Sequence, residues 1–302
     1  MCGIAGFVND MPIDVKCPVL QRMTDMIAHR GPDSEGHYID EHAALGHRRL
    51  SIIDLGGGQQ PIYNEDGSKV ITFNGEIYNY QTLREELIAA GHTFTTKSDT
   101  EVLLHGYEQW GVDLLQRVRG MFTFVIWDKN KQELFGARDH FGIKPFYYAK
   151  MNGTFMYASE IKSLLRHPDF VKELNAEALK PYMTFQYPAI GETFFKGVYK
   201  LPEGHYFTYR DGKMDIHRYY DEDFREGKQK LGELVNSIDQ TVCDSVKAHQ
   251  IADVEVGSFL SSGVDSSYVA AVARPQHTYS IGFGKGTYNE SQQAGELAEL
   301  LK

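Results

Sequence analysis

The chain has 302 residues, a net charge of −10 at neutral pH, 42% hydrophobic residues and 24% charged residues. These values are typical of a globular protein of up to two domains, and the acidic balance argues against a nucleic-acid binder. No run approaches the ~20 apolar residues of a membrane span. The three cysteines, at positions 2, 17 and 243, form neither a disulfide framework nor a zinc-site spacing. We therefore expect a cytoplasmic protein and predict no metal site.

Short β-like runs bounded by turn residues dominate the first two-thirds of the chain. The predicted strands are 3–8, 43–53, 69–73, 120–128, 133–138, 145–149, 154–158 and 205–209. Helical spacing of apolar residues predicts helices at 19–28, 81–90 and 99–110. Gly91 is the expected glycine after the second of these helices. Many antiparallel strands with a few grouped helices predict a layered α+β domain.

A polar, charged segment at 219–230 reads as a linker between two domains. After it come a predicted helix (231–249), a strand (254–260), a Ser/Gly turn, a helix (267–273) and a strand (278–283). This order is the start of a parallel βαβ arrangement. The predicted boundaries are thus 2–218, 219–230 and 231–302. Because two parallel strands cannot alone form a sheet buried on both faces, we expect the second domain to be incomplete and the chain to be C-terminally truncated.

A cysteine stands directly after the initiator methionine. Loss of Met1 leaves Cys2 with both a thiol and a free α-amine. A thiolate is a strong nucleophile, and an amine that titrates near neutral pH is a suitable acceptor for its proton. Taken alone, Cys2 is better interpreted as a terminal residue without a role, and the motifs that follow reverse this interpretation.

Two arginine motifs follow. The run from Arg30 to Asp33 reads as a braced proline turn. Arg49 leads into an apolar run, so its guanidinium can project into a cleft, where the planar fork suits bidentate capture of a carboxylate.

The run Asn74-Gly75-Glu76 has two interpretations. Asn-Gly is a common hairpin turn, but an asparagine amide beside a glycine N–H can also donate to one developing oxyanion, with Glu76 facing a substrate amine. Ser98-Asp99 likewise reads either as helix-cap chemistry or as a carboxylate that binds an α-ammonium.

The order of these motifs along the chain resembles the glutaminase domain of class II glutamine amidotransferases. The motifs are Cys2, Arg30–Asp33, Arg49–Ile53, Asn74–Glu76 and Ser98–Asp99. The later runs 138–147 and 158–162 resemble glutamine-hydrolysing asparagine synthetases. In the second domain, the run Ser-Ser-Gly-Val-Asp-Ser at residues 261–266 resembles the Ser-Gly-Gly-x-Asp-Ser pyrophosphatase loop of adenylating synthetases. It departs from that pattern at Ser262, where a glycine is usual, and a positive φ there would cost serine about 1 kcal/mol.

The resemblance implies a four-layer αββα N-terminal-nucleophile sandwich, followed by the start of an α/β adenine-nucleotide-binding domain. It implies that Met1 is removed, that Cys2 attacks the glutamine amide, and that Asn74 and Gly75 stabilise the oxyanion. The implied glutamine-binding residues are Arg49 for the carboxylate, Leu50, Ser51, Ile52 and Ile53 through the main chain, Asn74 and Gly75, and Glu76 with Asp99 for the amine. The implied ATP-binding residues are Leu260, Ser261, Ser262, Gly263, Val264, Asp265, Ser266 and Ile281.

The expected function is that of a glutamine-dependent asparagine synthetase, whose substrates are glutamine, aspartate and ATP with Mg²⁺. Ammonia released from glutamine would convert ATP-activated aspartate to asparagine, with release of AMP and pyrophosphate. We expect this chain to keep only the glutaminase chemistry. The alternatives are a related ATP-dependent amidotransferase with another acceptor, and a non-catalytic module that binds glutamine or a nucleotide. The resemblance allows a homodimer, and we expect neither a nucleic-acid nor a membrane partner.

Overall fold

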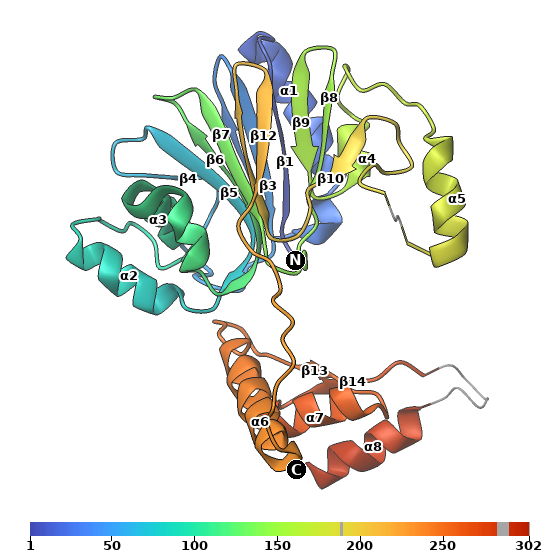
Figure 1. The fold of residues 1–302 in the computed structure, drawn as a ribbon. Helices are drawn as coiled ribbons and strands as arrows, with labels where there is room; N and C mark the ends of the chain where they lie inside the picture. Colours follow the sequence, from blue (N-terminus) through green and yellow to red (C-terminus); the bar gives the residue numbers. More distant parts are fainter. Residues whose placement is uncertain (188–189, 283–289, 302) are drawn as a thin grey trace. The chain divides into compact units, whose positions relative to one another are not determined.

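The computed structural model describes residues 1–187, 190–282 and 290–301. The chain divides into two compact units, Met1–Glu222 and Asp223–Lys302 (Figure 1). In the described residues, no helix combines the length and the apolar composition needed to cross a bilayer.

Two six-stranded sheets form the centre of the first unit. One has the order β10-β8-β9-β1-β3-β2 and the other β12-β11-β7-β6-β5-β4. In the first sheet the bounds are β1 Gly3–Val8, β2 Ser34–Ile39, β3 Ala43–Arg49, β8 Tyr147–Met151, β9 Thr154–Ala158 and β10 Val198–Lys200. In the second sheet they are β4 Ile62–Tyr63, β5 Lys69–Ile77, β6 Gly120–Asp128, β7 Glu133–Arg138, β11 His205–Arg210 and β12 Lys213–Arg218.

Helices pack against both sheets (Figure 1). Their bounds are α1 Ile13–Asp25, η1 Ala28–Arg30, α2 Tyr80–Ala89, α3 Asp99–Trp110, η2 Gly111–Gln116, α4 Ile161–Leu164 and α5 Ala176–Phe185. Helix α1 contacts β1 and β3 of the first sheet, whereas α3 contacts α2 and β5 of the second.

Three apolar clusters separate four layers. One cluster joins α1 to the first sheet, through residues such as Leu20 and Phe7. A second fills the space between the sheets and includes Ile4 and Trp127. The third joins α2, α3 and η2 to the second sheet, through residues such as Leu103 and Phe124. This stacking of helix, sheet, sheet and helix confirms the predicted αββα sandwich.

The sequence places several element bounds correctly and misplaces others. The predicted bounds of β1, β6, β7, β9 and α3 agree with the structure. Helix α1 starts at Ile13, not at residue 19, because the chain enters it from Pro12 and Pro18 is accommodated inside the helix. Gly91 has φ +104°, which suits the glycine predicted after α2.

The hairpin interpretation of Asn74-Gly75 is wrong. Strand β5 continues through both residues to Ile77, and they lie opposite Thr123 and Phe122 of β6. The reason is tertiary: β6 offers a full-length antiparallel partner, and this pairing overrides the local turn preference. A Cβ on Gly75 would lie 2.2 Å from the Met121 carbonyl oxygen, so glycine is required at this position for close strand approach.

The second unit contains α6 Leu231–Ala248, β13 Ser258–Phe259, α7 Val264–Ala273, β14 Thr278–Tyr279 and α8 Ser291–Leu300. Strands β13 and β14 pair in parallel, as a βαβ unit requires. The predicted strands are longer than this pairing. Val254 and Val256 are exposed, so they have no sheet to join, and Phe283 lies outside the described residues.

The end of the first unit is fixed by Tyr219 and Tyr220, which the sequence places in the linker. Both donate main-chain hydrogen bonds to the Gly204 carbonyl, and the Tyr219 hydroxyl donates to the Arg138 carbonyl at 2.8 Å. Residues 221–230 have no regular secondary structure.

Candidate functional site

Strand alternation carries four of the predicted residues to one place. Side chains at every second position of β1, β3 and β5 face the space between the sheets, as the buried Ile4, Leu45 and Val70 show. Continuing that alternation brings Cys2, Arg49, Asn74 and Glu76 to the same inner face. These residues stand at the start of β1 and at the ends of β3 and β5, where all of them line one pocket.

The pocket gathers nearly all residues predicted for the glutaminase chemistry. Its walls contain Cys2, Arg49, Leu50, Ile52, Ile53, Asn74, Gly75, Glu76 and Asp99. Ser51 does not line it, because the Ser51 N–H turns to the Asp33 carboxylate at 2.8 Å. Met1, Gly58, Gln60, Phe73, Ser98, Thr100 and Lys144 complete the lining.

The Cys2 sulfur lies between the two main-chain groups of Leu50. The Leu50 N–H donates to Sγ at 3.4 Å, and the thiol donates to the Leu50 carbonyl at 3.5 Å. Burial raises the pKa of the Cys2 thiol, while the Leu50 N–H and the chain-terminal amine oppose this rise. The Arg30 guanidinium donates to the Cys2 carbonyl at 2.9 Å and holds the backbone in place. The motif that begins at Arg30 therefore braces the nucleophile.

The Asn74 side chain is buried, and neither its Nδ2 nor its Oδ1 bonds to any residue that the structure describes. Buried amides are nearly always satisfied, so a bare one facing a pocket indicates a ligand position. The Gly75 N–H completes the arrangement. The Phe73 and Ile77 N–H groups on either side of it bond to Gln60 and Asp99, not to β6. By strand alternation, Gly75 turns its N–H to that same edge.

Arg49 supplies the positive charge of the pocket. Its buried guanidinium donates to the main-chain carbonyls of Ile53 at 3.1 Å, Asp54 at 2.6 Å and Leu55 at 3.3 Å. Among the residues that the structure describes, no carboxylate lies within ion-pair distance of it. A cation that is held in place but not neutralised suits an incoming carboxylate.

Asp99 supplies a buried negative charge. It follows the helix cap Ser98 at the start of α3, and its Oδ2 accepts from the Ile77 N–H at 2.9 Å. Burial, reinforced by the nearby Glu76, raises the pKa of Asp99 to about 7. An incoming ammonium group would offset this effect of burial and favour the ionised form of Asp99, so the two acids suit such a group.

The sequence missed two polar residues of the pocket. Gln60 fixes the backbone of β5, because its side-chain amide donates to the Phe73 carbonyl and accepts the Phe73 N–H at 2.6 Å. Lys144 is buried, and its Nζ lies 2.9 Å from the Met1 sulfur. Lys144 sits in the 138–147 run, where Asp139 accepts its N–H at 3.0 Å. That run was thus a usable signal for Lys144.

The predicted nucleotide loop lies in the second unit, before α7. Leu260, Ser261, Ser266 and Ile281 line a cavity of about 340 Å³ together with Tyr279 and Glu290. Ser262, Gly263, Val264 and Asp265 do not line it. Ser262 is not among the residues with positive φ, so the strain expected there does not arise. The Ser262 N–H donates to the Glu290 carboxylate at 3.4 Å.

The four-layer sandwich, with a cysteine opening an inner strand, has the architecture of class II amidotransferases. The structure of glutamine phosphoribosylpyrophosphate amidotransferase from B. subtilis matches 95% of this chain and 67% of its own, with a TM-score of 0.55 and 17% identity. This likeness supports the fold.

Residues 1–220 match the family described as the glutamine amidotransferase domain, and residues 237–302 match the family described as asparagine synthase. A glutamine-hydrolysing asparagine synthetase of Bacillus subtilis is 44% identical over all of this chain and 49% of its own length. A putative one of Methanocaldococcus jannaschii is 35% identical over all of this chain and 63% of its own. The chain therefore belongs to the asparagine synthetase family of glutamine amidotransferases, and it spans about half the length of most of the curated relatives that it matches.

Proposed function

We propose that this chain hydrolyses glutamine to glutamate and ammonia, with Cys2 as the nucleophile. The observation that carries the proposal is the bare, buried Asn74 amide in the same pocket as the Cys2 thiol. The sulfur supplies the nucleophile, and an amide without a partner among the described residues supplies a hydrogen-bond donor for the oxyanion.

Removal of Met1 prepares the pocket. With Met1 in its wall the cavity measures about 40 Å³, and the chain-terminal amine belongs to Met1. Burial lowers the pKa of that amine. Once Met1 is cleaved, the amine is on Cys2 itself. The amine is then adjacent to the thiol whose proton it takes.

Glutamine binds by its two charged ends. The Arg49 guanidinium receives the α-carboxylate, and Asp99 with Glu76 receives the α-ammonium. Leu50, Ile52 and Ile53 form the wall between them. This orientation directs the side-chain amide toward Cys2, as productive attack requires.

The reaction passes through two tetrahedral intermediates. The Cys2 amine accepts the thiol proton, and Sγ attacks the amide carbon. The oxyanion receives hydrogen bonds from Asn74 Nδ2 and the Gly75 N–H. Collapse breaks the C–N bond, and the leaving nitrogen takes the proton from the amine and departs as ammonia. Water, deprotonated by the same amine, then hydrolyses the thioester and releases glutamate.

We assign the later steps to a protein of the relatives' length. There, ammonia would displace AMP from an aspartate activated by ATP·Mg²⁺, and the products would be asparagine, AMP and pyrophosphate. The cavity beside Ser261 and Ser266 supports nucleotide binding, because hydroxyls and N–H groups before a helix N-terminus suit phosphate. The sequence also matches Amidase chry2 of Gibberella zeae at 35% identity over 90% of the chain, so an activity other than asparagine formation is the second candidate. Three free cysteines suit the cytoplasmic location that we propose.

The test compares Cys2→Ala with Cys17→Ala, which removes an exposed thiol. We expect mass spectrometry to show Met1 absent, diazo-oxo-norleucine to label Cys2, and glutamate release to be lost only in Cys2→Ala. A retained methionine with an unlabelled Cys2 would instead support a non-catalytic binding module. Adding aspartate and Mg-ATP, and measuring asparagine and AMP, separates the aspartate reaction from one with another acceptor.

A further inference from the structure

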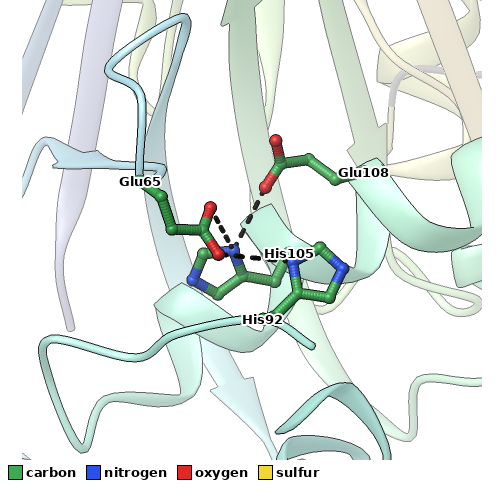
Figure 2. Close-up of side chains that lie close together, drawn as sticks. All are labelled: Glu65, His92, His105 and Glu108. Atoms are coloured by element: carbon green, nitrogen blue, oxygen red, sulfur yellow. Dashed lines mark hydrogen bonds and ion pairs between the residues drawn. The ribbon is translucent and has the colours of Figure 1, made fainter. Parts of the chain in front are cut away.

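Four potential metal ligands lie close together in the first unit, outside the pocket that contains Cys2 (Figure 2). Glu65 follows β4, His92 lies between α2 and α3, and His105 and Glu108 stand on α3. None of the four lines the pocket that contains Cys2. The three segments are far apart in sequence, and the His-x-x-Glu spacing puts two of the ligands on one face of a helix.

The distances suit a tetrahedral ion. His105 Nδ1 lies 3.1 Å from Glu108 Oε2 and 3.5 Å from Glu65 Oε2, and His92 Nδ1 lies 3.5 Å from Glu65 Oε1. One ligand atom from each residue can be chosen so that all four lie within 4.8 Å of one another. With bonds of about 2.0–2.2 Å, the edges of a tetrahedral zinc site are roughly 3.3 Å, so small side-chain shifts bring the four ligands onto one ion.

Contacts with residues outside the cluster hold His92, Glu108 and Glu65, whose Oε1 accepts the Thr93 N–H at 3.0 Å. His92 Nε2 lies 3.2 Å from Gln109 Oε1, which leaves Nδ1 on the side of Glu65. Glu108 Oε1 is bound by Asn64 at 2.7 Å and approached by Lys69 at 3.5 Å, which leaves Oε2 for the cluster.

His105 is the buried centre of the cluster, with a side chain 1% exposed. Its Nε2 makes no hydrogen bond to the residues that the structure describes, and Glu101 Oε1 lies 3.5 Å from it. Glu101 is itself held by the N–H and hydroxyl groups of Thr95 and Thr96. A fixed carboxylate behind the far nitrogen of a histidine is the usual support of a metal-binding imidazole. The carboxylates of Glu65, Glu101 and Glu108, each within 3.5 Å of a ring nitrogen of His105, also favour a cation here.

We propose that Glu65, His92, His105 and Glu108 bind one Zn²⁺ ion as a structural site. Two imidazoles and two carboxylates match the ligand preference of zinc, and the two negative charges balance the ion. Mg²⁺ is excluded by the imidazoles, since it prefers oxygen ligands and octahedral geometry. The ion would tie α3, which begins at Asp99, to the β4–β5 turn and to the α2–α3 loop.

The test uses three variants of the full chain. Glu65→Gln and His92→Gln each remove one ligand at a partly exposed position, so the fold should survive. His42→Gln is the matched control, because His42 also lies near a carboxylate, Asp10, at 3.9 Å, but outside the cluster. Each protein is incubated with ZnCl₂, desalted and analysed for bound metal by mass spectrometry. We expect one zinc per chain in the wild type and in His42→Gln, and loss of that equivalent in the other two.

Two further measurements test which types of ligand bind the ion and whether the ion stabilises the fold. Co²⁺ in place of zinc should give an intense tetrahedral visible spectrum without a thiolate charge-transfer band. Zn²⁺ at about 100 times its Kd should raise the melting temperature by roughly 5–10 °C, and Mg²⁺ should not. The proposal is overturned if the wild type retains no zinc, if both ligand variants retain the full equivalent, or if the cobalt spectrum shows thiolate ligation.

Discussion

Replacement of Asp99 by asparagine should weaken glutamine binding and stabilise the fold at the same time. The structure buries this carboxyl and raises its pKa from the ordinary 3.8 to about 7. Asparagine keeps the shape and an acceptor for the Ile77 N–H but carries no charge for a substrate ammonium. Losing one partner of a buried charge pair costs about 2–5 kcal/mol, so KM for glutamine should rise by roughly 30-fold to several thousand-fold.

The stability effect has the opposite sign. An acid whose pKa is raised on folding binds more protons in the folded state, so its contribution to stability falls as pH rises from about 4 to 7. A difference of about 3 pKa units corresponds to roughly 4 kcal/mol at most, which Asp99→Asn should recover in part above pH 7. The stability of the variant should therefore decline less than that of the wild type between pH 4 and 7.

The assay is glutamate release across pH 5–9, with thermal melts at the same pH values. The efficiency of the wild type relative to Asp99→Asn should increase with pH up to about 7 and then level off, because only ionised Asp99 binds the ammonium. Asp113→Asn, at an exposed position in η2, is the control and should change neither KM for glutamine nor thermal stability. An Asp99→Asn protein with an unchanged KM, or with lower stability at pH 8, would refute this reasoning.

Three other substitutions probe the pocket. Asn74→Ala should lower kcat by about 10²–10³-fold with little change in KM or melting temperature. The reason is that the amide has no partner to lose among the described residues. A large loss of stability would contradict this. Gly75→Ala should destabilise the first unit by about 1–3 kcal/mol in urea unfolding, since its Cβ meets the Met121 carbonyl; a wild-type midpoint would argue against that contact. Arg49→Lys should raise KM for glutamine about 10–100-fold in steady-state assays, since lysine lacks the bidentate fork; an unchanged KM would show that Arg49 does not hold the carboxylate.

Local patterns were sufficient where one segment determines its own structure. The β-like runs of β6 and β7 and the cap at Ser98 placed the two strands and the start of α3 correctly. Asn74-Gly75 could be decided only by tertiary structure, because the turn preference is local and the pairing with β6 joins residues almost 50 positions apart. The first turn and a half of α1 was missed, since the predicted helix begins only at Val19, whereas α1 begins at Ile13 and contains Pro18.

The candidate site shows the same division. Cys2, Arg49, Asn74 and Asp99 were found because their order along the chain resembles a known family. Lys144 and Gln60 do not react in the chemistry described here, and they enter the pocket through loops whose course depends on buried partners such as Asp139. The cluster around His105 was invisible in the sequence, where we predicted no metal site. Only α3 supplies ligands at a recognisable spacing, and folding brings Glu65 and His92 to them.

The position of Met1 in the wall of the glutamine pocket has a practical consequence for expression design. An affinity tag, protease scar or fluorescent fusion ahead of Cys2 would occupy the space for the substrate, beside Lys144. It would also convert the α-amine of Cys2 into a peptide bond. Purification handles for this chain therefore belong at its carboxyl end.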